Sequence, residues 1–139
     1  MDQLLKKETA AAFTRLEQVV ATLRGENGCP WDIKQTPASL KKYLLEECHE
    51  LAEAIDRGNE KEICEEIGDV FFILTMLIAM FTEHNHFTGD DVFDGIIAKM
   101  IRRHPHVFSN VRLFDAEELQ AQWQRIKAQE KQLSSPHLP

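Results

Sequence analysis

Two pairs of acidic residues lie at equal distances on either side of Gly58, and they restrict the possible folds more than any other feature of the sequence. Glu47 and Glu50 stand one helical turn apart before the glycine, and two more acids repeat that spacing after it. A helical hairpin that reverses at this glycine brings the two pairs face to face, because positions equidistant from a tight turn lie opposite each other. The resulting cross-pairs are Glu50 with Glu66 and Glu47 with Asp69. The sequence therefore predicts a square of four carboxylates between two antiparallel helices.

Apolar residues recur at helical spacing along most of the chain, and capping residues mark where the segments begin. We expect five helices, over about residues 2–24, 37–57, 59–83, 88–103 and 115–132. The segments 28–35 and 104–108 are predicted to be irregular connections, and 134–139 a short flexible tail. No strand-like alternation is long enough to build a sheet. The predicted fold class is all-α, an oligomeric helical bundle of about five helices with a central acidic hairpin.

The second half of the helix predicted over residues 59–83 is apolar on every face. Its most apolar stretch, residues 70–81, is shorter than the roughly 20 residues needed to span a bilayer, so we expect a buried helix and no membrane partner. A helix that is hydrophobic all round must be covered by its own domain or by another subunit. We favour a subunit interface.

Composition places the chain in a broad class. With 139 residues it fits one domain, and a net charge of -7 disfavours duplex nucleic acid as a partner. The three cysteines, Cys29, Cys48 and Cys64, lack C-x-x-C spacing and are interpreted as reduced thiols. The N-terminal residues do not resemble a signal peptide. The expected location is cytoplasmic.

The acidic strings on the two central helices have two interpretations. Charge runs on helices are usually solvated faces. However, like charges three or four residues apart destabilise a helix by a few tenths of a kcal/mol per pair, and basic residues are nearly absent from these faces. Helix axes ~8–10 Å apart also leave space for ions between the carboxylates. Ligands that offer only oxygen suit Mg²⁺, or Mn²⁺ as a substitute, whereas zinc more often recruits His or Cys.

A basic cluster, Lys99, Arg102 and Arg103, occurs near the end of the helix predicted over residues 88–103. Favourable charge at a helix C-terminus explains any one of these residues. The spacing also allows two or three cations to bind one ligand. An acidic metal square combined with such a cluster is what phosphoryl or nucleotidyl chemistry requires.

Five stretches now form a recognisable series along the chain. They are Cys29-Pro30-Trp31-Asp32 with Gln35-Thr36, Leu45-Glu46-Glu47-Cys48-His49-Glu50, Glu66-Ile67-Gly68-Asp69, Arg102-Arg103-His104-Pro105-His106-Val107-Phe108, and Trp123 with Ile126-Lys127. Together they resemble the MazG family of nucleoside triphosphate pyrophosphohydrolases, over about residues 16–131. The resemblance implies a single domain over residues 1–133 that hydrolyses NTPs or dNTPs to the monophosphate and pyrophosphate.

The resemblance also implies roles and partners. Glu47, Glu50, Glu66 and Asp69 fall where the family places its magnesium ligands. Glu46 lies beside them, either as an acid that supports a metal ligand or as the general base, so the catalytic residues are expected to be Glu46, Glu47 and Glu50. The substrate-binding residues are expected to be Lys99, Arg102, Arg103, Trp123 and Trp31, with Trp123 ranked above Trp31 as the aromatic residue beside the base. The best-known members carry two such domains in tandem, so this chain is expected to form a homodimer or a dimer of dimers.

Two alternatives remain open. A di-iron carboxylate bundle uses Glu-x-x-His pairs, which occur here at Glu46 to His49 and at Glu83 to His86. Glu83 lies roughly 25 Å along a helix from Glu66, at about 1.5 Å per residue, so the two pairs cannot share one site in a monomer. The other alternative is a non-catalytic nucleotide-binding or regulatory dimerisation module of the same fold. The four mutually repelling acids count against it, because such a module has no need for them.

Overall fold

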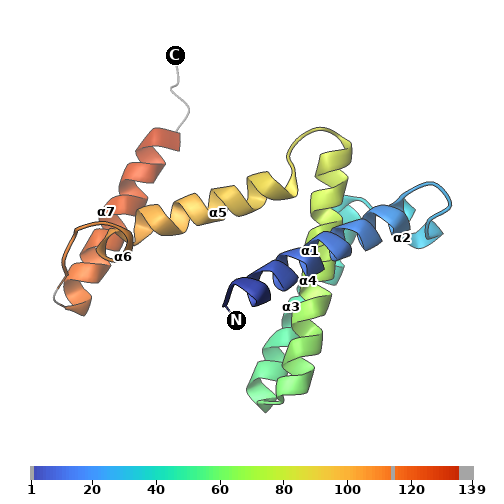
Figure 1. Cartoon of the computed structure of the whole chain (residues 1–139), viewed down its shortest axis with the longest axis horizontal. Helices are drawn as coiled ribbons and strands as arrows, with labels where there is room; N and C mark the ends of the chain where they lie inside the picture. The colour runs from blue at the N-terminus through green and yellow to red at the C-terminus, as the bar shows by residue number, and fades with distance from the viewer. Residues whose placement is uncertain (1, 114, 135–139) are drawn as a thin grey trace. The chain divides into compact units, whose positions relative to one another are not determined.

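The computed structural model describes residues 2–113 and 115–134, with side chains over 8–113 and 115–133, and these residues form helices and no strands (Figure 1). The helices are α1 (Asp2–Arg24), α2 (Pro30–Lys34), α3 (Pro37–Arg57), α4 (Glu60–Glu83), α5 (Gly89–Arg103), α6 (Pro105–Phe108) and α7 (Ala116–Ser134). The all-α prediction is confirmed, and the five predicted helices are all present.

The short helices α2 and α6 correct the prediction of irregular connections at 28–35 and 104–108. Each begins with a proline, Pro30 or Pro105, at its first helical position. Proline fixes φ near the helical value and lacks the N–H that would stay unpaired there. Helices of five and four residues are too short to show an apolar period, so the prolines were their only signal.

The chain divides into two compact units, Met1–Gly89 and Asp90–Pro139. The first holds α1 to α4, and the second holds α5 to α7. The assignment of residues 1–133 to a single functional domain stays a prediction. The predicted flexible tail lies outside the described residues except for Ser134, which ends α7.

The α3–α4 hairpin forms as the acidic spacing predicts, because its ends are fixed by local chemistry. Thr36 and Ser39 form a reciprocal capping box at the start of α3. Gly58 ends the helix with a φ of 68°, a left-handed conformation that costs glycine little. The Asn59 side chain then accepts hydrogen bonds from the Lys61 and Glu62 amides and starts α4. The two helices pack side by side (Figure 1).

The core of the first unit joins α1, α3 and α4. Its buried centre consists of Val20, Leu40, Met76 and Met80. Arg24, at the end of α1, donates hydrogen bonds to both carboxylate oxygens of Glu83, at 2.8 and 3.0 Å, and to the backbone carbonyl of Asp32 at 2.6 Å. One buried guanidinium thus ties together the ends of α1 and α4 and the α2 segment.

The apolar half of α4 is covered only in part by its own chain. Ile73, Met76 and Met80 are buried, whereas Ile67, Phe71 and Leu74 remain 36–41% exposed on another side of the helix. No helix among the described residues is long and apolar enough to cross a membrane. The predicted buried helix is therefore correct on one side. The other side is an apolar stripe that the described residues of the first unit cover only in part, with the Phe13 ring edge-on to Phe71 at 5.4 Å.

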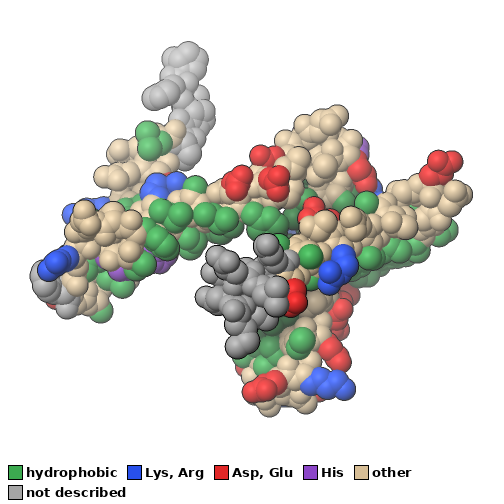
Figure 2. Space-filling model, in the orientation of Figure 1, with side chains coloured by type: hydrophobic (Ala, Val, Ile, Leu, Met, Phe, Trp, Pro, Cys, Tyr) green, Lys and Arg blue, Asp and Glu red, His purple; other side chains and the backbone are tan. Residues whose placement is uncertain are grey.

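In the second unit, α5 also carries exposed apolar residues, as Figure 2 shows along its length. They are Val92, Phe93, Ile96, Ile97 and Ile101. Helix α7 starts where the sequence predicts, with the Asp115 carboxylate accepting a hydrogen bond from the Glu118 amide at 2.8 Å. Salt bridges between the end of α5 and α7 fasten this unit together.

Candidate metal and phosphate site

The hairpin brings three of the four predicted metal ligands together. Carboxylate oxygens of Glu47, Glu66 and Asp69 all lie within 4.8 Å of one another. Glu50 is outside this set, but its negative charge raises the pKa of both Glu47 and Glu66. The predicted cross-pairing about Gly58 is therefore present, with Glu50 at the edge of the cluster.

The electrostatics of the cluster disfavour the ionisation of all its carboxyl groups at once. Burial raises the pKa of Glu66 to about 7, with further contributions from Glu50 and Asp69. Burial and the same two neighbours also raise the pKa of Glu47 above its usual range. In addition, the Oε2 atoms of Glu47 and Glu66 are buried and have no hydrogen-bond partner among the described residues. Buried carboxylate oxygens normally have partners, so two unpartnered oxygens in one carboxylate cluster fit a bound cation.

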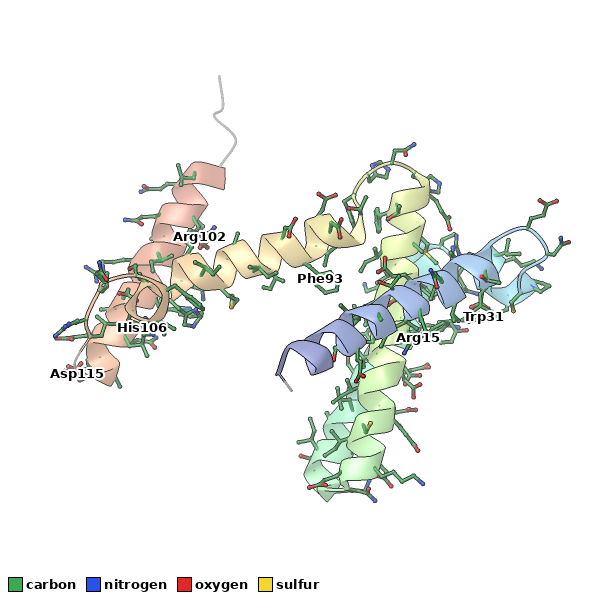
Figure 3. All side chains as sticks on the ribbon, in the orientation of Figure 1. Arg15, Trp31, Phe93, Arg102, His106 and Asp115 are labelled. Carbon is green, nitrogen blue, oxygen red and sulfur yellow. The ribbon has the colours of Figure 1, made fainter. Side chains whose placement is uncertain are left out.

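The basic half of the predicted site belongs to the second unit. Arg102 and Arg103 end α5, where Figure 3 labels Arg102, and both bind the carboxylate of Glu130 on α7. Arg103 also lies over the Trp123 ring, with its guanidinium carbon 5.4 Å from the ring centroid. Lys99 is half-buried one turn earlier on α5. The two arginines and the tryptophan thus gather at one end of this unit.

Comparison with known proteins identifies the family. A sequence profile of the MazG nucleotide pyrophosphohydrolase domain matches residues 35–108, which is just over half of the chain. The chain belongs to the MazG family. The matched residues contain all four predicted metal ligands, Glu46 and the basic cluster.

The chain is also similar to three further proteins, two of which carry the MazG name. YabN of Bacillus subtilis (strain 168) is 45% identical over 126 residues, covering 91% of this chain and 26% of that protein. The nucleoside triphosphate pyrophosphohydrolase/pyrophosphatase MazG of Thermotoga maritima is 44% identical over 125 residues, covering 90% of this chain and 48% of that protein. A crystal structure of a MazG-related protein from Thermotoga maritima aligns with a TM-score of 0.69 at 26% identity, covering 83% of this chain and 98% of that one. The chain spans less than half the length of these two curated relatives.

The remaining predicted site residues, Glu46, Trp31 and Trp123, lie outside the set of three clustered carboxylates. Glu46 is exposed on α3, and its charge contributes to the raised pKa of Glu47. Trp31 is 43% exposed on α2, and its ring meets the Tyr43 ring edge-on at 5.3 Å. Trp123 meets the His104 ring edge-on at 5.2 Å. Both tryptophans therefore pack against their own unit, and their contact with a nucleotide stays a prediction.

Sequence reasoning missed one residue of the basic half, Glu130. The helical spacing of Trp123, Lys127 and Glu130 places them on one face of α7, and this was the available signal. The charge alone was uninformative, because exposed acids are common on helices.

The raised pKa of Glu66 predicts how the stability of the metal-free protein depends on pH. Glu66 takes up a proton on folding, because its pKa rises from 4.5 to about 7. That stabilisation is complete below about pH 4.5 and is lost as pH rises through 7. We expect the melting temperature in EDTA to fall between pH 5.5 and 8 and Mg²⁺ to raise it again at pH 8. In Glu66→Gln, circular dichroism melts should show a weaker pH dependence. A fall as steep as that of the unmodified protein would assign it to other groups.

Proposed function

We propose that this MazG protein hydrolyses nucleoside triphosphates, NTPs or dNTPs, to the nucleoside monophosphate and pyrophosphate in a Mg²⁺-dependent reaction. The observation that carries the proposal is the pair of buried, unpartnered oxygens of Glu47 and Glu66 beside Asp69. Acidic clusters on helix pairs are common, but two buried carboxylate oxygens that have no partner among the described residues favour a bound cation. The name of the Thermotoga maritima MazG relative, a nucleoside triphosphate pyrophosphohydrolase/pyrophosphatase, states the same chemistry for that protein.

The ligands for the cation are assigned to four acids, Glu47, Glu50, Glu66 and Asp69. Their donor atoms are all carboxylate oxygens, which suits Mg²⁺, with Mn²⁺ as a substitute. When bound, the ion supplies Lewis-acid chemistry, which lowers the pKa of water and offsets negative charge on phosphate. The carboxylates keep the ion in place because the hairpin fixes their positions on two packed helices.

Each of the remaining protein groups is assigned one role in the reaction. A water oxygen forms a bond to the α-phosphorus, and the bond from that phosphorus to the α–β bridging oxygen breaks, so pyrophosphate leaves. Glu46, exposed next to the cluster, accepts the proton of the attacking water. Lys99, Arg102 and Arg103 bind the phosphates and offset the charge of the leaving group. Trp123, and secondarily Trp31, is assigned to the base.

The direct test is an assay of pyrophosphate release from each of the eight common NTPs and dNTPs, with Mg²⁺ and with EDTA. Release that requires the metal supports the proposal and reveals the base and sugar preference. Nucleotide binding without turnover in every case would indicate the non-catalytic module instead. Iron in the purified protein together with a visible absorption band would favour the di-iron alternative.

We further propose that a second copy covers the apolar stripe of α4. Ile67, Phe71 and Leu74 recur at spacings of four and three residues, so they lie on one side of the helix. Gly68 lies beside them, and a methyl group added there would meet no described atom within 4 Å apart from its chain neighbours and the nearby backbone of its own helix. A glycine in a helix costs about 0.5–1 kcal/mol relative to alanine, so close approach of another chain is a better reason for it than packing within its own chain.

The double variant Ile67→Glu/Leu74→Glu is expected to shift the protein from dimer to monomer, because two buried charges would be left unpaired at the interface. Sedimentation equilibrium at micromolar concentrations measures the change. Leu45→Glu is the matched control, since Leu45 is 62% exposed on α3. A monomeric unmodified protein at these concentrations would contradict the proposed homodimer.

A further inference from the structure

A single carboxylate holds both arginines at the end of α5. The Oε1 atom of Glu130 accepts a hydrogen bond from Nε of Arg102 at 2.8 Å, and Oε2 accepts one from Nη2 of Arg103 at 2.9 Å. A longer bond of 3.4 Å joins Nε of Arg103 to Oε1. The charges sum to +1, so the group keeps a net attraction for anions.

The two arginines are held in different ways. The Arg103 side chain is 16% exposed and donates hydrogen bonds to both carboxylate oxygens of Glu130. Its guanidinium group also lies over the Trp123 ring. The Arg102 side chain is 50% exposed, and its hydrogen bond to the described residues comes from Nε. A guanidinium can bind one acceptor along its Nε side and another at its Nη end. Arg102 therefore keeps its Nη end available while its orientation is already fixed.

We propose that Glu130 is a positioning residue for substrate binding, which orients Arg102 so that its two Nη nitrogens meet a phosphate group. Arg103 serves as the brace that fixes Glu130 and Trp123. The inference rests on the proposed function, since it assigns separate tasks to the two arginines of that site. Pre-orienting a long side chain lowers the ordering entropy that a ligand must overcome, so it strengthens binding without touching the ligand.

The ionisation of Glu130 is consistent with a permanent role. The hydrogen bonds from Arg103 and Arg102 hold the pKa of Glu130 at about 2. The carboxylate therefore stays charged at any ordinary assay pH, and the pair persists before and after substrate binds.

An opposite role for Glu130 is chemically reasonable and gives an opposite result. If its carboxylate occupied the position of a substrate phosphate, it would compete with the substrate, and its removal would tighten binding. In the structure, however, Glu130 contacts Arg102 through Nε and leaves the Nη end uncovered by it. This geometry favours orientation over competition.

The test compares Glu130→Gln with Glu117→Gln, which makes the same change at an exposed acid in the first turn of α7. We expect Glu130→Gln to raise KM for the preferred triphosphate about tenfold, the typical effect of weakening a charge-assisted hydrogen bond, with kcat within about twofold. Glu117→Gln should leave both unchanged. A KM that falls would show competition, and a KM equal to that of the control would remove the positioning role.

A double-mutant cycle separates orientation from support of the fold. In an Arg102→Ala background, Glu130→Gln should raise KM no further, because the side chain that it orients is gone. It should still lower the melting temperature, because its bonds to Arg103 are lost. A full additional KM increase in that background would show that Glu130 acts through the fold or through another group, and would overturn the inference.

The affinity for inorganic tripolyphosphate, measured by calorimetry, tests the positioning role without requiring turnover. If the unmodified protein releases no pyrophosphate but binds tripolyphosphate about tenfold more tightly than Glu130→Gln does, the proposed function fails and the positioning role stands. If the unmodified protein turns over triphosphates and Glu130→Gln matches it in KM and in tripolyphosphate affinity, only the positioning role fails. Absence of tripolyphosphate binding by the unmodified protein would also overturn the positioning role.

Discussion

Asp69→Asn and Glu50→Gln are each expected to abolish magnesium-dependent pyrophosphate release while the helical fold persists. Each change removes one charged oxygen ligand and keeps the side-chain volume. Even partners in the outer shell of a metal site are typically worth 10–100-fold, so loss of a ligand should cost more than about 100-fold in turnover. Asp69 lies within the three-carboxylate set, whereas Glu50 lies at its edge. We therefore expect the larger loss for Asp69→Asn.

The control for both variants is Glu65→Gln, an exposed acid next to Glu66 that is outside the metal set. It should retain activity, which separates loss of a ligand from a general loss of negative charge on α4. Circular dichroism should show equal helix content in all three variants, and the melting temperature in EDTA should not fall, because removing a like charge relieves repulsion. Magnesium-dependent release that survives in either ligand variant would rule out this cluster as the active site.

The hairpin was predictable because its determinants are local. Gly58 and Asn59 fix the turn, and the acidic spacing then determines which residues lie opposite each other. The capping residues likewise gave the starts of the long helices to within a residue or two. The short helices α2 and α6 were missed because their length carries no period.

The membership of the carboxylate cluster was predictable from the sequence, but its environment was not. Spacing identified Glu47, Glu66 and Asp69 as neighbours, but the orphaned oxygens depend on how closely α3 and α4 pack. The different contacts and exposure of Arg102 and Arg103 also could not be predicted from the sequence. Adjacent arginines look equivalent there, and only the contact with α7 distinguishes the buried one from the exposed one.

In helix α4, the acidic half that forms the carboxylate cluster depends on the apolar half that packs in the core. Its acidic half supplies Glu66 and Asp69, and its apolar half anchors the hairpin through Met76 and Met80. The anchoring half must offset the repulsion in the acidic half when no cation is bound. A defect in the core should therefore leave the metal-free protein with the least stability.

Leu40→Ala tests this dependence, and we expect a loss of about 2–5 kcal/mol in the free energy of unfolding without metal, as for other fully buried leucines. Leu40 is 0% exposed at the junction of α1, α3 and α4. Leu45→Ala makes the same change five residues later on the same helix, where the side chain is 62% exposed, and should cost less than about 1 kcal/mol. Urea unfolding in EDTA measures both.

Magnesium should then restore much of what Leu40→Ala loses, because a ligand that binds only the folded state stabilises it. At 100 times its dissociation constant the gain is about 2.7 kcal/mol, which is comparable with the expected loss. The midpoint of urea unfolding should rise with Mg²⁺ in Leu40→Ala and in Leu45→Ala alike, and it should stay unchanged in a Leu40→Ala/Asp69→Asn double variant. Equal rises with and without Asp69 would show that the ion acts elsewhere on the protein, and the link between the core and the carboxylate cluster would be lost.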